Sequence, residues 1–185
     1  MGAEPWAYFV PYQQDTAKAM AELQAREFKA GRYNEWAKQQ NKTFRDIDDL
    51  REKCAEDGTR SILDMERVLD KPRSADDPAH VLKNFQSICE EEMKSGEIKS
   101  PEDMMKVLME RLGGQDIVSS NTYSAVAPLS REQLMTLYGT VTPSRSMVEE
   151  NQDIYELLTR GQGVYVVVFT GKKPSEIYFV GLSYD

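Results

Sequence analysis

The stretch Val164-Tyr165-Val166-Val167-Val168-Phe169, followed after a polar loop by Ile177-Tyr178-Phe179-Val180-Gly181-Leu182, decides the fold of this 185-residue chain. Both runs are β-branched and aromatic, a composition typical of strands. Successive strand residues point to opposite faces of a sheet, and both sets are apolar here. We therefore predict a hairpin in a sheet covered on both sides, with five buried side chains: Val166, Val168, Phe169, Ile177 and Phe179.

Two further segments are expected to join this sheet. Tyr123–Ala127 is a plausible strand ending at Pro128, and Trp6–Val10 is a short apolar run bounded by Pro5 and Pro11. Proline cannot donate to a strand ladder, so the Trp6–Val10 run is expected at an edge. The sheet is expected to be mainly antiparallel.

Helices are indicated by caps and apolar periodicity along the chain. Asp15 or Thr16 begins one helix that ends at Gly31, and Thr43 begins a second that runs to about Gly58. Residues 130–133 form a capping-box pattern and open a short helix closed by Gly139. A longer helix is expected over 144–160. The segment 61–69 is compatible with a strand or a short helix.

The middle of the chain carries the clearest helical periodicity. Apolar residues lie on one face from Val81 to Met93, and Ser100-Pro101-Glu102-Asp103 then begins a helix that stops at Gly113-Gly114. Two helices joined by a short loop predict a helical hairpin over 79–113. The prediction is thus a single α+β domain over 1–185, with a mainly antiparallel sheet and about five or six helices including this hairpin.

Composition narrows the class of protein. The net charge is −8, and no block of Lys and Arg occurs, which argues against nucleic-acid binding. No apolar run approaches the ~20 residues of a membrane helix, and the N-terminus lacks a secretory pattern, so we expect a cytoplasmic protein with no membrane contact. Cys54 and Cys89 lie on apolar helix faces and are expected to be buried thiols.

The number and spacing of the histidine, cysteine and acidic residues argue against most familiar catalytic sites. His80 is the only histidine, and its surroundings are those of a charged helical surface. One histidine and two distant cysteines do not supply zinc ligands at workable spacing. The acidic triplets of the chain point in different directions on a helix, so they do not converge on one ion. We therefore predict no catalytic residue set, no metal and no cofactor.

Two groups of residues remain as binding candidates. The loop Asp57-Gly58-Thr59-Arg60-Ser61 combines a glycine, hydroxyls and a guanidinium, the groups that hold anions, although it lacks the spacing of a known phosphate loop. Aromatic residues near the N-terminus, among them Tyr33 and Trp36, exceed what one core needs and predict an exposed interaction patch. The candidate binding residues are therefore Tyr33, Trp36, Asp57, Thr59 and Arg60.

Four short stretches resemble an uncharacterised family of bacterial cytosolic proteins. They are Pro5–Tyr12, Phe28–Tyr33, Asp57–Asp64 and Ser175–Gly181. The similarity covers less than half of the chain and implies a bacterial origin. It transfers no activity and no site residue.

These observations favour a non-catalytic protein-interaction module over an enzyme. The acidic charge allows a basic protein partner, and a homodimer is also compatible with the sequence. The alternative is a small-molecule or anion-binding enzyme that uses Arg60 with nearby hydroxyls and carboxylates. A deep pocket that holds Arg60 beside carboxylates would favour the enzyme, and a flat aromatic surface would favour the interaction module.

Overall fold

The computed structural model describes residues 4–33, 43–54, 58–73 and 124–183. All of them belong to one compact unit, formed by residues 1–73 together with 124–185. The predicted helical hairpin over 79–113 lies outside the described residues, as do Trp36, Asp57, His80 and Cys89.

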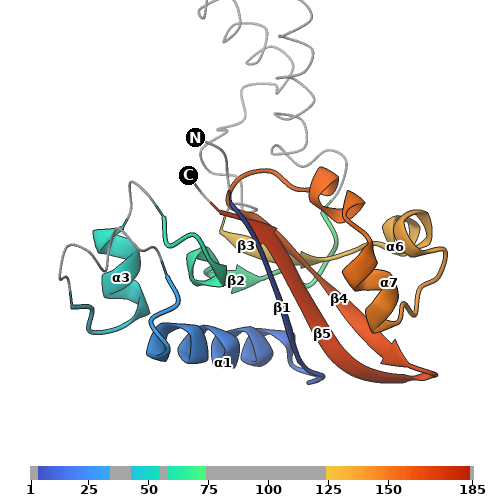
Figure 1. Cartoon of the computed structure of the whole chain (residues 1–185), viewed down its shortest axis with the longest axis horizontal. Helices are drawn as coiled ribbons and strands as arrows, with labels where there is room; N and C mark the ends of the chain where they lie inside the picture. Colours follow the sequence, from blue (N-terminus) through green and yellow to red (C-terminus); the bar gives the residue numbers. More distant parts are fainter. Residues whose placement is uncertain (1–3, 34–42, 55–57, 74–123, 184–185) are drawn as a thin grey trace, which may run out of the picture. The chain divides into compact units, whose positions relative to one another are not determined.

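The centre of this unit is a five-stranded sheet in the order β1-β5-β4-β3-β2 (Figure 1). Its strands are β1 (Pro5–Pro11), β2 (Arg67–Val68), β3 (Ala125–Pro128), β4 (Gln162–Thr170) and β5 (Lys173–Leu182). The two strands of the predicted hairpin and β1 at an edge are confirmed. The strand expected over Tyr123–Ala127 is found as β3, with Pro128 included and Tyr123 outside the described residues. The connection between the last two strands is a two-residue turn and is shorter than the polar loop expected, because Thr170 pairs with Lys173.

The α+β class is confirmed, but the prediction of a mainly antiparallel sheet is wrong. β1, β5 and β4 are antiparallel neighbours, whereas β4 pairs with β3, and β3 with β2, in parallel. The physical reason is the connection between β3 and β4, which passes through several helices. Such a helical crossover returns the chain in the same direction, whereas a tight hairpin reverses it.

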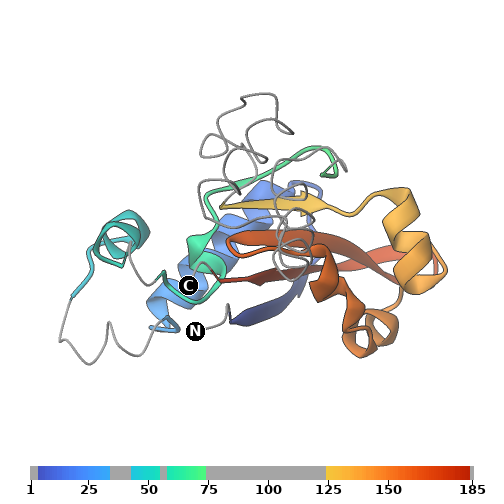
Figure 2. The ribbon, with the colours of Figure 1, turned by 90° about the horizontal axis from the view of Figure 1, so that it is seen from above.

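Both faces of the sheet are covered, as the apolar hairpin predicts. On one face, Ile177 and Phe179 pack with side chains of α1 (Thr16–Lys29). On the other, Val166 and Val168 pack beneath α6 (Arg131–Tyr138) and α7 (Arg145–Glu150). Figures 1 and 2 show these helices on opposite sides of the strands.

Four of the five side chains predicted to be buried are at most 2% exposed. The prediction for Phe169 is wrong, because this residue is only half-buried. It lies near the end of β4, beyond the part of the strand that β3 covers. Cys54 is buried as expected.

A row of residues crosses all five strands and contains two glycines. Trp6 of β1 is paired with Gly181, Gly181 with Gly163, and Gly163 with Val126 and then Val68. The glycines leave a shallow trough that the Trp6 indole fills. A Cβ on Gly163 would lie 2.7 Å from the indole Cη2, and one on Gly181 would overlap the ring. The indole therefore reaches from the edge strand across two neighbouring strands.

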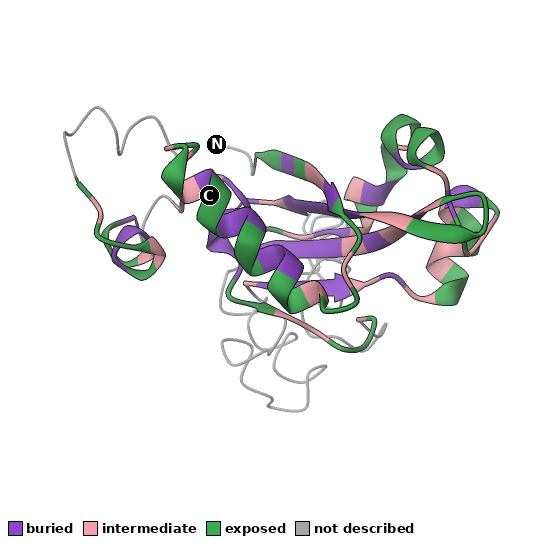
Figure 3. Ribbon diagram, turned by 90° about the horizontal axis from the view of Figure 1, so that it is seen from below, coloured by how far each residue is buried: buried purple, intermediate pink, exposed green. Residues whose placement is uncertain are grey.

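The helix predictions are confirmed where a cap is strong. Asp15 caps α1 by accepting from the Lys18 amide, and α1 buries one face against the sheet while its other face is exposed (Figure 3). The capping box of α6 is present, with Ser130 and Gln133 bonded reciprocally, and Gly139 ends the helix in a left-handed conformation.

Two helix predictions are corrected. The helix expected from Thr43 begins only after Asp46, as α3 (Ile47–Lys53), because the Asp46 side chain accepts from the Asp49 amide. The long helix over 144–160 is broken into α7 and the 3-10 helix η3 (Asp153–Leu157), since Asn151 has an extended backbone. The described part of the chain thus has four α-helices, and the two helices of the predicted hairpin lie outside it.

The ambiguous segment 61–69 contains both kinds of structure. Ser61 caps the 3-10 helix η1 (Ile62–Asp64), and the two-residue strand β2 follows. Among the described residues, no helix combines the length and the apolar composition needed to cross a membrane.

Replacing Gly181 with Ala tests the trough beneath Trp6. Because the new methyl group would overlap the indole, we expect a loss of about 3 kcal/mol in the free energy of unfolding, at the upper end for overpacked cores. Urea unfolding of the variant measures it. In a Trp6→Ala background the same glycine substitution should cost much less, since the ring is gone. An equal cost in both backgrounds would contradict the packing described.

Candidate functional site

The predicted anion loop is tightly held by its own hydrogen bonds. Gly58 and Arg60 both have a positive φ, 63° and 56°, and for arginine this left-handed conformation is uncommon. The Thr59 amide donates to Asp64 Oδ1 at 2.6 Å, and the Thr59 and Ser61 hydroxyls lie 3.1 Å apart. These contacts fix the loop although its backbone is strained.

The predicted site residues are placed in different environments. Thr59 is 1% exposed. Arg60 forms an ion pair with Glu4, with its Nη1 3.0 Å from Glu4 Oε1. Tyr33 is half-buried and contacts the rings of Phe28 and Phe44, at centroid distances of 6.1 and 5.6 Å. The structure therefore does not present Tyr33 as part of a flat exposed patch.

A polar cavity of about 280 Å³ lies beside this loop. Its lining combines carboxyl, hydroxyl, thiol and guanidinium groups and consists of Arg51, Cys54, Gly58, Thr59, Asp64, Glu66 and Ser124. The size is close to the lower end of ligand pockets, ~300 Å³, so the cavity would accommodate only a small molecule or a single side chain. Of the predicted site residues that the structure describes, Thr59 contributes to its wall.

The guanidinium in this cavity is largely committed to the fold. Arg51 donates from Nε to the Leu63 carbonyl at 2.6 Å and from Nη2 to the Met65 carbonyl at 2.5 Å. Its Nη1 lies 3.2 Å from Asp48 Oδ1. These bonds tie α3 to η1, and they leave few donors of Arg51 for a bound anion.

Asp64 is the most unusual titratable group of the cavity. Burial raises the pKa of its carboxyl above the ordinary value, and the opposing contributions of the Thr59 hydrogen bonds and the Arg51 charge do not cancel this effect. Its Oδ2 is buried and has no hydrogen-bond partner among the described residues. Because Oδ2 is shielded from solvent while Oδ1 anchors the Thr59 amide, we interpret Asp64 as a structural brace of the loop.

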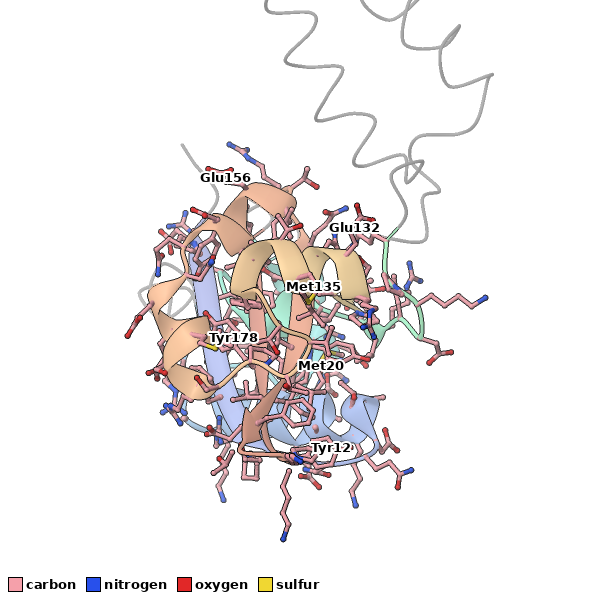
Figure 4. All side chains as sticks on the ribbon, turned by 90° about the vertical axis from the view of Figure 1, so that its right-hand side faces the viewer. Tyr12, Met20, Glu132, Met135, Glu156 and Tyr178 are labelled. Carbon is pink, nitrogen blue, oxygen red and sulfur yellow. The ribbon has the colours of Figure 1, made fainter. Side chains whose placement is uncertain are left out.

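A second, larger hollow of about 400 Å³ lies at the other end of β4. We call it the apolar groove, and all of its lining residues are aliphatic, aromatic or proline: Tyr12, Pro128, Leu129, Leu134, Val141, Tyr165, Val166, Val167, Phe169 and Pro174. Tyr12 is 40% exposed, and Met135, 47% exposed, projects from α6 on the same side of the molecule (Figure 4).

The groove follows a part of β4 that only one strand covers. β3 pairs with β4 from Gln162 to Tyr165 and then leaves the sheet at Pro128. From Val166 to Thr170, β4 is paired on one side by β5 and by no strand on the other within the described residues. On this open side, the Phe169 amide donates to the Pro143 carbonyl at 2.9 Å.

Comparisons with known proteins add no assignment. The chain matches no family model, no curated protein and no solved structure. Within the described ranges, no group of three or more His, Cys, Asp or Glu residues is arranged to hold a metal ion.

Sequence reasoning missed most residues of both hollows. Asp64 and Arg51 gave no motif, because one lies in a 3-10 turn and the other in a short charged helix. Tyr12 belongs to the N-terminal aromatics, but its place at the groove depends on β1 pairing with the distant β5. The unpaired side of the second half of β4 could not be predicted from the sequence, because local periodicity does not show which distant strands pair.

The raised pKa of Asp64 predicts how stability depends on pH. A carboxyl whose pKa is higher in the folded than in the unfolded state opposes folding once it is ionised. The ionisation of Asp64 therefore lowers the free energy of unfolding as pH rises from the unfolded-state pKa, 3.8, through the folded-state pKa. Across that window we expect the wild-type protein to lose stability relative to Asp64→Asn. Urea unfolding at several pH values measures this difference, with Asp48→Asn, at an exposed carboxyl, as the control.

The raised pKa would be contradicted if, with rising pH, the free energy of unfolding of the wild type increased relative to that of Asp64→Asn. A difference that does not change with pH would contradict it as well.

Proposed function

We propose that this chain is a protein-interaction module and that the apolar groove is its recognition site. The observation that supports the proposal is the combination of a mainly apolar lining with a side of β4 that no strand pairs within the described residues. Apolar hollows with partly exposed aromatic residues are typical of surfaces that bury a partner's side chains. The groove is also large enough, at about 400 Å³, to receive more than one side chain.

The partly exposed residues of the groove give it an accessible rim. Tyr12 is 40% exposed, and Val141, Val167 and Phe169 are half-buried. Side chains of this kind lose their remaining water contact when a partner binds, and the removal of apolar surface from water favours association. They can also be replaced individually without emptying the core.

The partner is proposed to be a protein and to be basic. The net charge of −8 favours the approach of a positively charged partner. The short-range contacts with that partner are proposed to be made by the groove. The cytoplasm and a bacterial origin remain predictions from the sequence, as does the possibility of a homodimer.

Replacing rim residues with acids tests the proposal. Peptides selected by display against the wild-type protein are expected to bind Tyr12→Glu and Val141→Glu at least tenfold more weakly, because each change places a charge in an apolar contact. Titration calorimetry measures the affinity. The matched control is Met147→Glu on α7, since Met147 is 38% exposed and does not line the groove.

Thermal unfolding of all three variants separates lost binding from lost folding. If Tyr12→Glu and Val141→Glu remain folded and bind as tightly as Met147→Glu, the groove is not the recognition site.

A second candidate function rests on the polar cavity. The raised pKa of Asp64 and the presence of Cys54, Thr59 and Glu66 in one lining are compatible with a small-molecule enzyme that uses a carboxyl as acid or base. The shielded Oδ2 and the engaged guanidinium of Arg51 make this site less accessible than the groove. Arg60, the residue expected to lead such chemistry, pairs with Glu4.

A further inference from the structure

On its side away from β5, the part of β4 beyond Tyr165 has main-chain groups that no strand pairs within the described residues. The Phe169 amide points away from β5, because it donates to Pro143, which lies in the loop before α7. Alternate residues of a strand direct their main-chain groups to the same side. The register shift between Val168 and Phe169 skips Ser175 of β5, so the extra residue lies on β5 and the alternation along β4 continues through it. The amide and carbonyl of Val167 therefore also face away from β5, into the interval between Pro128 and Pro143.

The groove has walls on both faces of the sheet. Val166 and Leu129 belong to the apolar cluster beneath α6, and Leu134 of α6 packs against it. Val167 alternates with Val166 and so lies on the opposite face, where its partner Ile177 packs toward α1. A hollow that includes both faces occurs only where the sheet ends, so the groove passes around the edge of β4.

We propose that the occupant of the groove is an extended segment of a partner protein, added to the sheet as a strand beside Val167. This inference rests on the proposed function and specifies its partner. The segment exchanges main-chain hydrogen bonds with Val167, and its successive side chains fill the two faces of the groove. Recognition by an edge strand requires an extended backbone, so a helical ligand does not fit this geometry.

The interval limits the length and sequence of the segment. From Tyr165 to Phe169 a strand advances about 13 Å, which is the space available to three or four extended residues. Since successive side chains point to opposite faces and both faces are apolar, the segment carries two apolar residues at adjacent positions. A segment whose apolar residues are separated by one polar residue places both on the same face and leaves the other unfilled.

Amide hydrogen exchange on the full chain tests this mode of binding. In the free protein, the Val167 amide is expected to exchange at least tenfold faster than those of Val166 and Val168, which face β5. The probe is a hexapeptide with two adjacent apolar residues between polar ones. At saturation it should slow exchange at Val167 at least tenfold and leave Val166 and Val168 unchanged.

Two matched peptides provide the controls. The first has the same composition with the apolar pair separated by one polar residue, and it should bind at least tenfold more weakly. The second carries a single N-methyl group on the amide that pairs with the Val167 carbonyl. It should also lose at least tenfold in affinity, whereas methylation of the next amide, which points away from β4, should have little effect.

The possible failures can be distinguished. If peptides bind and Tyr12→Glu weakens them, but exchange at Val167 does not change, strand addition is wrong and the proposed function stands. If no displayed or designed peptide is affected by Tyr12→Glu, the proposed function itself is wrong. If Val167 becomes protected as protein concentration rises without peptide, a second copy of the chain occupies the groove and the proposed partner segment is overturned.

Discussion

The indole of Trp6 above Gly163 and Gly181 is the contact on which the register of the sheet depends. A one-residue slip of β1 would place the indole over a residue with a Cβ and would turn the buried side of β1 to solvent. The same contact brings β1, from the start of the chain, onto β5 from its end. The bond from the Ser183 amide to the Glu4 carbonyl, at 2.9 Å, continues this pairing beyond the strands.

The register of β1 also determines one wall of the apolar groove. With Trp6 opposite Gly181, Pro11 lies opposite Glu176, and the Tyr12 amide donates to the Ser175 carbonyl at 3.0 Å. Tyr12 is thereby placed in the same groove lining as Pro174 and Phe169. The opposite wall arises because β3 leaves β4 at Pro128 and continues into α6. The groove is thus a consequence of two strands of unequal length flanking the hairpin, and its apolar character comes from the same residues that build the sheet.

Local sequence was sufficient for the elements whose signals are local. The composition of the last two strands predicted burial on both faces, and the Ser130 capping box and the Asp15 cap predicted α6 and α1. The direction of β3 relative to β4 could not be predicted, because it depends on how a crossover folds back. The role of Gly163 could not be predicted either, because it lies in β4 and makes room for an indole more than 150 residues earlier in the chain.

The candidate site was less predictable than the fold for the same reason. Thr59 could be singled out from the loop chemistry, and it does line the polar cavity. Asp64, which accepts from the Thr59 amide, and the guanidinium of Arg51 were not identified as candidates from the sequence. Their roles depend on burial and on hydrogen bonds that only the folded chain forms. Aromatic composition predicted an exposed patch near the N-terminus, but Tyr33 is half-buried against Phe28, and Trp36 lies outside the described residues. Tyr12, which was not among the candidate residues, is 40% exposed.

The most direct test of this account is to locate the binding site of a selected peptide by mapping changes in backbone amide chemical shifts during its titration into the full chain. We expect the largest changes on Val166–Phe169 of β4, on Leu134 and on Val141, and no change at residues around the polar cavity such as Thr59 and Glu66. Changes concentrated at Thr59, Asp64 and Glu66, with the groove unperturbed, would contradict it and would favour the cavity as the functional site.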